Sequence, residues 1–78
     1  MMQFTMNEVS ELTAHAIPAT LDINDDMLNQ QLKLRLKYNG MGAEFVVPYD
    51  TLYEMPSSAV LPYIKLLITG SKNKLVHM

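Results

Sequence analysis

Three basic side chains alternate with leucines in the middle of the chain. Lys33, Arg35 and Lys37 are each two residues apart, and we call them the basic row. In a β-strand this spacing places all three on one face over roughly 13 Å, at about 3.3 Å per residue. Such a row could bind the phosphates of a nucleic acid. It could also be the solvated face of a sheet, and Glu44 nearby together with a sequence pI of about 5.5 favours that interpretation.

Carboxylates without a counter-charge occupy the first third of the chain, because residues 1–26 contain no Lys or Arg. Spaced carboxylates could compete for a basic groove that normally holds nucleic acid, since such a groove is complementary to both kinds of anion. Each acid also has a local interpretation, at a helix start, a turn or a cap, and this interpretation is favoured. We call these residues the acidic set: Glu8, Glu11, Asp22, Asp25 and Asp26.

No constellation for catalysis or cofactor binding is recognisable. The chain has no cysteine, and its two histidines, His15 and His77, lie near opposite ends, so a zinc site would need carboxylates of no recognisable spacing. Residues 22–26 begin like a calcium-binding loop, but Met27 replaces the turn glycine. The serines lack a nucleophile motif and the glycines form no phosphate loop. We therefore expect no enzyme activity, no metal and no cofactor.

Length and composition restrict the elements that could position these side chains. The chain has 78 residues, of which 49% are apolar and 18% charged, so we expect one compact domain over residues 1–78 rather than disorder. The first dozen residues carry acids and lack the basic and apolar regions of a secretory signal. The longest apolar run is far shorter than the ~20 residues of a membrane span. We expect a cytoplasmic protein that does not bind membranes.

The clearest structural signal is a β-hairpin over about residues 31–49. Leucines alternate with the basic row, and the Asn-Gly dipeptide at 39–40 favours a type I′ turn between two strands. A two-residue loop would pair Arg35 with Glu44, whereas a four-residue loop would pair Lys37 with it. Both registers bury apolar residues against one another, so the sequence does not choose between them.

The N-terminal third predicts a helix and then a strand. Thr5 and Glu8 have the spacing of a capping box, which favours a helix over about residues 6–17, although the alternation of Met2 and Phe4 with polar residues also fits a strand. A strand over residues 19–23 follows, and then a turn or a cap at 24–26 that leads toward the hairpin. The residues expected on the inward face of the helix are Met6, Val9, Leu12, Ala16 and Ile17.

Two helices are predicted after the hairpin. Asp50 could cap a single helical turn that stops before Pro56. Ser57 or Ser58 could then cap a second helix that ends at Gly70, followed by a short basic tail that frays or adds an edge strand. The sequence thus predicts an α+β fold, with a small three-stranded antiparallel sheet packed against two or three short helices.

These features favour non-enzymatic binding of a protein. Methionines and tyrosines near turns could form an exposed apolar patch around the hairpin tip and the turn that follows it, with Met41, Tyr53 and Met55 as its candidate residues. A homodimer is also possible, because so small a core leaves little stability to spare. The alternative function is weak binding of nucleic acid by the basic row, in a monomer or a dimer.

In general character the chain resembles the small proteins that phages and mobile elements encode to inhibit host machinery, anti-CRISPR proteins among them. The likeness lies in its short length, its lack of cysteine, its mild acidity and its lack of catalytic motifs, and it covers no individual residue. The resemblance implies steric or electrostatic blocking of a nucleic-acid-handling complex, with the acidic set as the first candidate surface.

Overall fold

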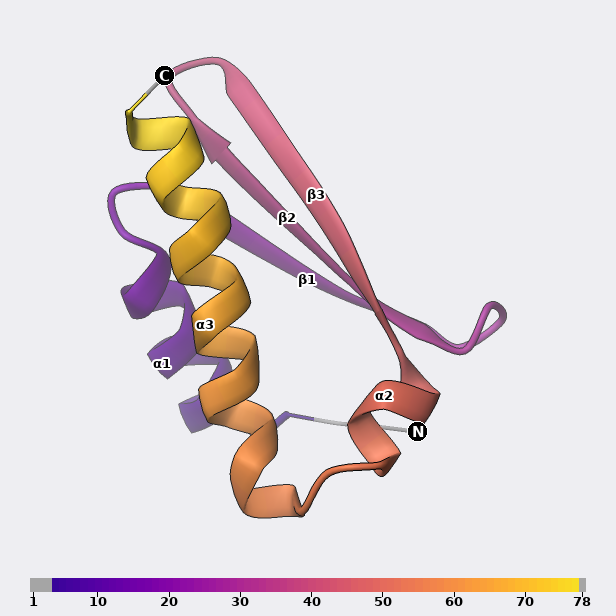
Figure 1. The fold of residues 1–78 in the computed structure, drawn as a ribbon. Helices are drawn as coiled ribbons and strands as arrows, with labels where there is room; N and C mark the ends of the chain where they lie inside the picture. Colours follow the sequence, from indigo (N-terminus) through magenta and orange to yellow (C-terminus); the bar gives the residue numbers. More distant parts are fainter. Residues whose placement is uncertain (1–3, 78) are drawn as a thin grey trace.

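Six elements follow one another in the computed structural model, which describes residues 4–77 (Figure 1). The three strands form one antiparallel sheet in the order β1-β2-β3, so the predicted α+β fold is confirmed. Met2, which entered the alternative strand prediction, lies outside the described residues. The elements are α1 (Met6–Ala16), β1 (Thr20–Asp26), β2 (Gln31–Tyr38), β3 (Met41–Pro48), α2 (Tyr49–Tyr53) and α3 (Ser57–Val76).

The central hairpin adopts the shorter of the two possible loops. Arg35 lies opposite Glu44, and Leu34 opposite Phe45, which is the register of a two-residue turn. Asn39 and Gly40 both have positive φ, 55° and 82°, as a type I′ turn requires. The Asn-Gly dipeptide therefore sets the pairing of β2 with β3.

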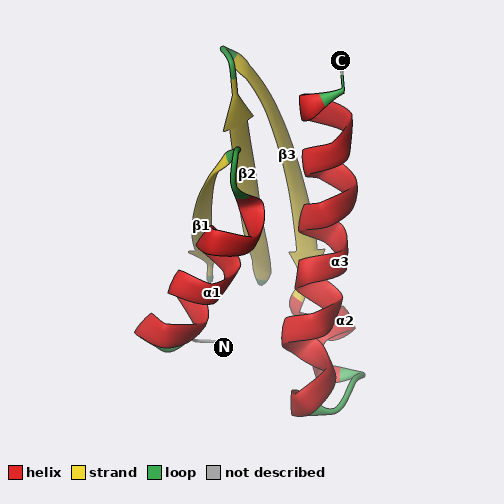
Figure 2. Ribbon diagram, turned by 90° about the vertical axis from the view of Figure 1, so that its left-hand side faces the viewer, coloured by secondary structure: helices red, strands yellow, loops and turns green. Residues whose placement is uncertain are grey.

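The sheet has one buried face and one open face. α3 runs along the buried face (Figures 1 and 2), and α1 packs on the same side, where Leu12 and Ala16 join the leucines of β2 in the core. The opposite face carries the basic row and is covered by no helix of the described residues. The fully buried large side chains are Leu12, Leu32, Leu34, Leu36, Val47, Leu52, Ile64 and Ile68.

The predicted N-terminal helix is confirmed, but its inward face is narrower than expected. Thr5 and Glu8 form both hydrogen bonds of the capping box, at 3.2 and 2.9 Å. Of the five residues predicted to face inward, only Leu12 and Ala16 are buried, while Met6, Val9 and Ile17 are exposed. The reason is the position of α1, which packs over β1, the edge strand of the sheet.

The turn predicted at residues 24–26 is wrong. These residues continue β1 and pair with Lys33, Leu32 and Gln31, and the chain turns only at residues 27–30. Asn and Asp are unfavourable in strands when considered alone. Pairing with the full length of β2 outweighs that preference.

The C-terminal helix is longer than predicted. α3 does not stop at Gly70 but continues to Val76, so the tail is helical, and Leu75 is buried against the core. Neither Ser57 nor Asp50 caps a helix, because Pro56 and Pro48 occupy the N-cap positions of α3 and α2. Leu75, beyond Gly70, extends the packed face, and its burial outweighs the local signal for a stop.

Polar side chains attach α1 to α3 beside the apolar core. Lys65 and Glu11 form an ion pair, and Nε2 of His15 lies 2.7 Å from Oγ1 of Thr69. Nζ of Lys72 donates to the carbonyl oxygen of His15 at 3.0 Å, near the C-terminal end of α1, where orphan carbonyls need donors. These contacts fix the position of α1 relative to α3.

Substitutions at two of the three glycines, Gly40 and Gly70, test these assignments, because they should change the stability in opposite directions. We expect Gly40→Ala to lower the free energy of unfolding by about 1 kcal/mol, because alanine is strained at positive φ. We expect Gly70→Ala to raise it by about 0.5 to 1 kcal/mol, because Gly70 lies inside α3 and an added Cβ meets no atom within 4 Å. Urea unfolding followed by circular dichroism measures both. Equal effects of the two substitutions would contradict the assigned turn and helix.

Candidate protein-binding surface

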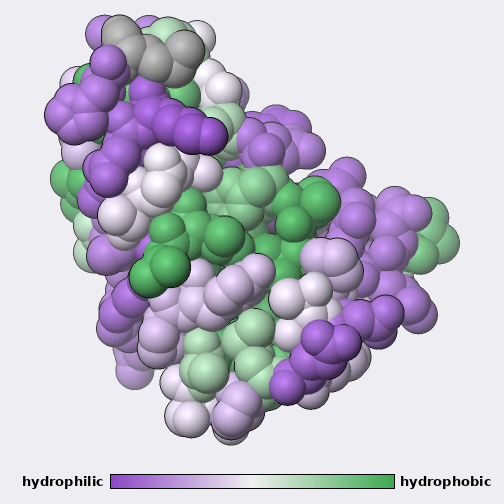
Figure 3. Space-filling view, in the orientation of Figure 1, coloured by the Kyte–Doolittle hydropathy of each residue, from purple (hydrophilic) through white to green (hydrophobic). Residues whose placement is uncertain are grey.

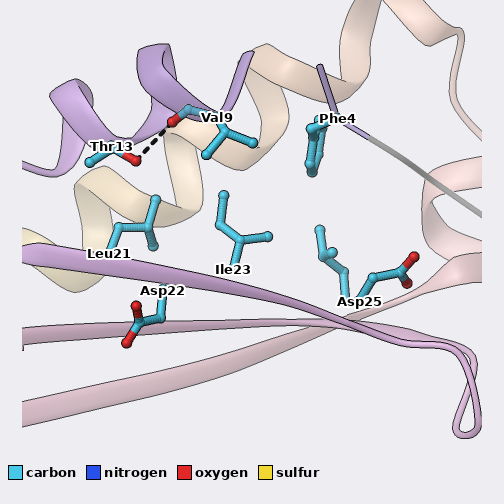
Figure 4. A pocket seen from close by; sticks show the side chains of 8 residues that line it. Phe4, Val9, Thr13, Leu21, Asp22, Ile23 and Asp25 are labelled. Carbon is cyan, nitrogen blue, oxygen red and sulfur yellow. Dashed lines mark hydrogen bonds between the residues drawn. The ribbon is translucent and has the colours of Figure 1, made fainter. Parts of the chain in front are cut away.

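A groove with a volume of about 510 Å³ lies between α1 and β1 (Figure 4). Five of the eight residues that line it are apolar, and the other three are one threonine and two aspartates. Thr13 is engaged within α1, since its hydroxyl donates to the carbonyl oxygen of Val9 at 2.8 Å. The residues that line the groove are Phe4, Val9, Thr13, Leu21, Asp22, Ile23, Asp25 and Leu32.

The groove opens along the edge of the sheet. Leu21 and Ile23 point toward α1, whereas Asp22 points to the other side of β1 (Figure 4). Because residues directed to both faces of β1 line the groove, we place the groove at the outer edge of that strand. β1 is an edge strand of the sheet, so the groove places apolar side chains beside a backbone edge that residues 4–77 leave unpaired.

Apolar groups at this edge are accessible. Val9 is 38% exposed, and Phe4 and Ile23 are half-buried. Figure 3 shows that apolar side chains also reach the surface in the middle of the face formed by α3, with hydrophilic ones around them. The remaining exposed large apolar side chains are spread over several elements: Met6, Ile17, Met27, Leu28, Val46, Tyr53 and Leu66.

The basic row is matched by acids on the open face. Arg35 donates to Oε2 of Glu44 from Nε at 3.1 Å and from Nη2 at 2.8 Å. Nζ of Lys33 lies 3.6 Å from Oδ2 of Asp26, and Asp22 is the cross-strand neighbour of Arg35. By strand parity, three cations and three carboxylates share this face, which therefore carries no net charge.

Hydrogen bonds stabilise the charged forms of these acids. The guanidinium of Arg35 holds the pKa of Glu44 below its usual value, first by hydrogen bonding and then by its charge. The side-chain hydrogen bond from Asn29 lowers the pKa of Asp26, to which the hydrogen bond from Gln31 and the charge of Lys33 add. The carboxylates stay ionised at neutral pH and continue to oppose the cations.

The acidic set does not form one surface. Glu8 completes the capping box of α1, and Glu11 pairs with Lys65 of α3. The other three members lie on β1, with Asp22 and Asp26 on the open face and Asp25 on the helix side, where it accepts a hydrogen bond from Tyr49. Within residues 4–77, no hydrogen bond or salt bridge holds the carboxylate of Asp22.

The methionine and tyrosine residues predicted to form one patch are far apart. Met41 begins β3, whereas Tyr53 lies in α2 and Met55 follows it, at the other end of that strand. The length of β3, about 23 Å at 3.3 Å per residue, separates the two ends. Met41 and Met55 also pack against the core, while Tyr53 is exposed.

Sequence reasoning missed the groove, because it placed Val9 inside the core. The period of the helix identifies a face but not what lies opposite each residue. The short length of α1 and its position at an edge strand were the missing facts. One available signal was the alternation of Leu21 and Ile23 with the polar residues Thr20, Asp22 and Asn24, which is the pattern of a strand with two different faces.

Other classes of site find no geometric support in the described part of the chain. Over residues 4–77, His, Asp and Glu side chains do not gather in any group of three or more that could hold a metal ion. None of the helices described there combines the length and apolarity needed to cross a bilayer. No family model, no curated protein and no solved structure matches this chain.

The contact of Tyr49 with Asp25 predicts a late tyrosine ionisation. The hydrogen bond to Asp25, with burial and the negative charge of that carboxylate, raises the pKa of Tyr49 from 10.0 to about 12. Between these values the unfolded side chain loses its proton and the folded one keeps it, so the free energy of unfolding decreases as pH rises. We expect the phenolate absorbance of the protein to show a last step near pH 12 that Tyr49→Phe lacks. Identical titrations of both proteins would contradict the contact.

The open face predicts little affinity for nucleic acid. Because its charges are balanced, we expect a labelled DNA duplex to show no anisotropy change at physiological salt. Glu44→Gln removes the ion pair of Arg35 and gives the open face a net positive charge, so it should increase binding at low salt. Binding by the unmodified protein that falls steeply with salt and is lost in Lys37→Gln would contradict this account.

Proposed function

We propose that the chain is a non-enzymatic protein-binding module that uses the groove between α1 and β1. The observation that carries the proposal is the groove itself, which joins half-exposed apolar side chains to the free edge of a strand. Exposed apolar surface next to unpaired backbone is costly unless a partner covers it. Protein partners are the usual ligands of such edges.

A small-molecule ligand is a poorer fit to the same groove. Small ligands are fixed by a few convergent polar groups in an enclosed pocket. Here the groove is open along β1, and two of its three polar residues already have partners, Thr13 on Val9 and Asp25 on Tyr49. Its apolar walls instead offer area for side chains of a larger partner.

We propose that the chain acts by covering the part of the partner protein that it binds. A module without catalytic groups acts on a partner by occupying a surface that the partner needs elsewhere. The resemblance to small phage-encoded inhibitors in size and composition supports an inhibitory role of this kind. Groove geometry supports contact with a protein, and the balanced charge of the open face gives no support to binding of nucleic acid.

A substitution in the groove tests the proposal. We expect Val9→Glu to abolish capture of the partner from an extract of the native cells, because a carboxylate would face the apolar walls. Leu66→Glu is the control, since Leu66 is 75% exposed on α3 and lies outside the groove. Quantitative mass spectrometry measures the captured proteins, and circular dichroism verifies that both variants fold. A partner retained equally by both variants would contradict the proposal.

A further inference from the structure

We infer that the occupant of the groove is an extended, basic segment of a partner protein that adds to β1 as a fourth strand. This inference rests on the proposed function and specifies the chemistry of the partner. It follows from three properties of β1: its free edge, the different surroundings of its two faces, and its charge.

The free edge supplies the main-chain contacts. β1 has seven residues, Thr20–Asp26, and all seven pair with β2 on one side. Among the described residues no strand pairs with its other side. In an antiparallel sheet alternate backbone N–H and C=O groups of an edge strand point outward, so a segment of similar length could bond along the whole edge.

The two faces of β1 predict alternating side chains in the added strand. Successive side chains of a strand point to opposite faces. One set would enter the groove beside Val9, Leu21 and Ile23, and the other set would lie on the open face next to Asp22. The segment should therefore alternate apolar residues with residues that complement a carboxylate.

The negative charge of β1 indicates that these complementary residues of the added strand are basic. β1 carries Asp22, Asp25 and Asp26 and no cation. Asp26 is engaged by Asn29 and Lys33, and Asp25 by Tyr49, but within residues 4–77 Asp22 has no hydrogen bond or salt bridge. Arg35, opposite Asp22 in the ladder, acts on this carboxylate through its charge alone, because its hydrogen bonds go to Glu44. A Lys or Arg of the added strand, next to Asp22, would give this carboxylate its first hydrogen-bonded partner.

The same charges disfavour a second copy of this chain as the occupant. Antiparallel pairing of two β1 strands would bring six carboxylates to one seam, and like charges across a ladder are destabilising. The carboxylates of β1 therefore disfavour pairing with the β1 strand of a second copy and favour pairing with a basic strand.

Peptides test the inference directly. We expect a library of labelled peptides of about seven residues, with apolar residues alternating with Lys or Arg, to yield members that bind the full chain. Exchange of Lys and Arg for Glu should abolish their binding. No bound member, or equal binding of the acidic peptides, would overturn the inference.

Backbone methylation distinguishes strand addition from mere contact. Two versions of a binding peptide carry N-methyl groups on alternate sets of residues, with identical side chains. We expect one version to lose at least about tenfold in affinity, because its main-chain donors toward β1 are removed together, and the other to bind as before. Equal affinity of the two versions would overturn strand addition.

A charge reversal identifies the face. Asp22→Lys should weaken the basic peptide by about fivefold, the upper range for an exposed ion pair, while Asp50→Lys makes the same charge change on α2 and should not. Equal losses in both variants would overturn the role of Asp22.

The two proposals can fail separately. If Val9→Glu abolishes capture of a protein partner but no peptide behaves as described, the inference fails and the proposed function stands. If Val9→Glu changes neither partner capture nor peptide binding, both fail. A sedimentation experiment that finds a stable dimer lost on reversal of β1 charges would assign the edge to a second copy and overturn the inference.

Discussion

The alternation of leucine with basic residues along β2 is the constraint on which the rest of the structure depends. β2 is the central strand, so its register fixes both neighbours. A slip of one residue would move Lys33, Arg35 and Lys37 into the core and the leucines into water. The buried face needs a helical cover, and the charged face excludes one. Both α1 and α3 therefore pack on the same side, and the open face takes acids from β1 and β3 as partners for its cations.

The groove results from the different lengths of the two helices, α1 and α3, that cover the buried face of the sheet. α3 has twenty residues and spans the sheet, whereas α1 has eleven and packs over the edge strand. Contacts of Glu11 and His15 with α3 hold α1 toward the centre of the molecule. Leu12 and Ala16 reach the core from that position, and Val9 is left facing the space above β1. A domain of this size thus completes its core and leaves one strand edge beside an apolar wall, which is the feature that we assign to partner binding.

Local patterns were sufficient to predict part of this arrangement. The Asn-Gly turn, the capping box at Thr5 and Glu8 and the class of the fold are confirmed, because each depends on neighbours in the sequence. The end of β1 was mispredicted because pairing with β2 overrides the local preference for a turn at residues 24–26. The length of α3 was mispredicted because burial of Leu75 overrides the local preference for a helix end at Gly70. The hairpin pattern predicted that Glu44 would pair with the basic row, whereas the contribution of Asp22 and Asp26 was missed, because the length of β1 and its pairing with β2 were not known.

Amide hydrogen exchange of the chain, alone and bound to its captured protein partner, tests the central claim most directly. If the partner adds a strand to β1, alternate amides of Thr20–Asp26 should exchange more slowly in the complex, because they become donors in a new ladder. The amides of β3, at the opposite edge of the sheet, should be unchanged. Unchanged exchange along β1 in a chain that remains bound to its partner would contradict the account.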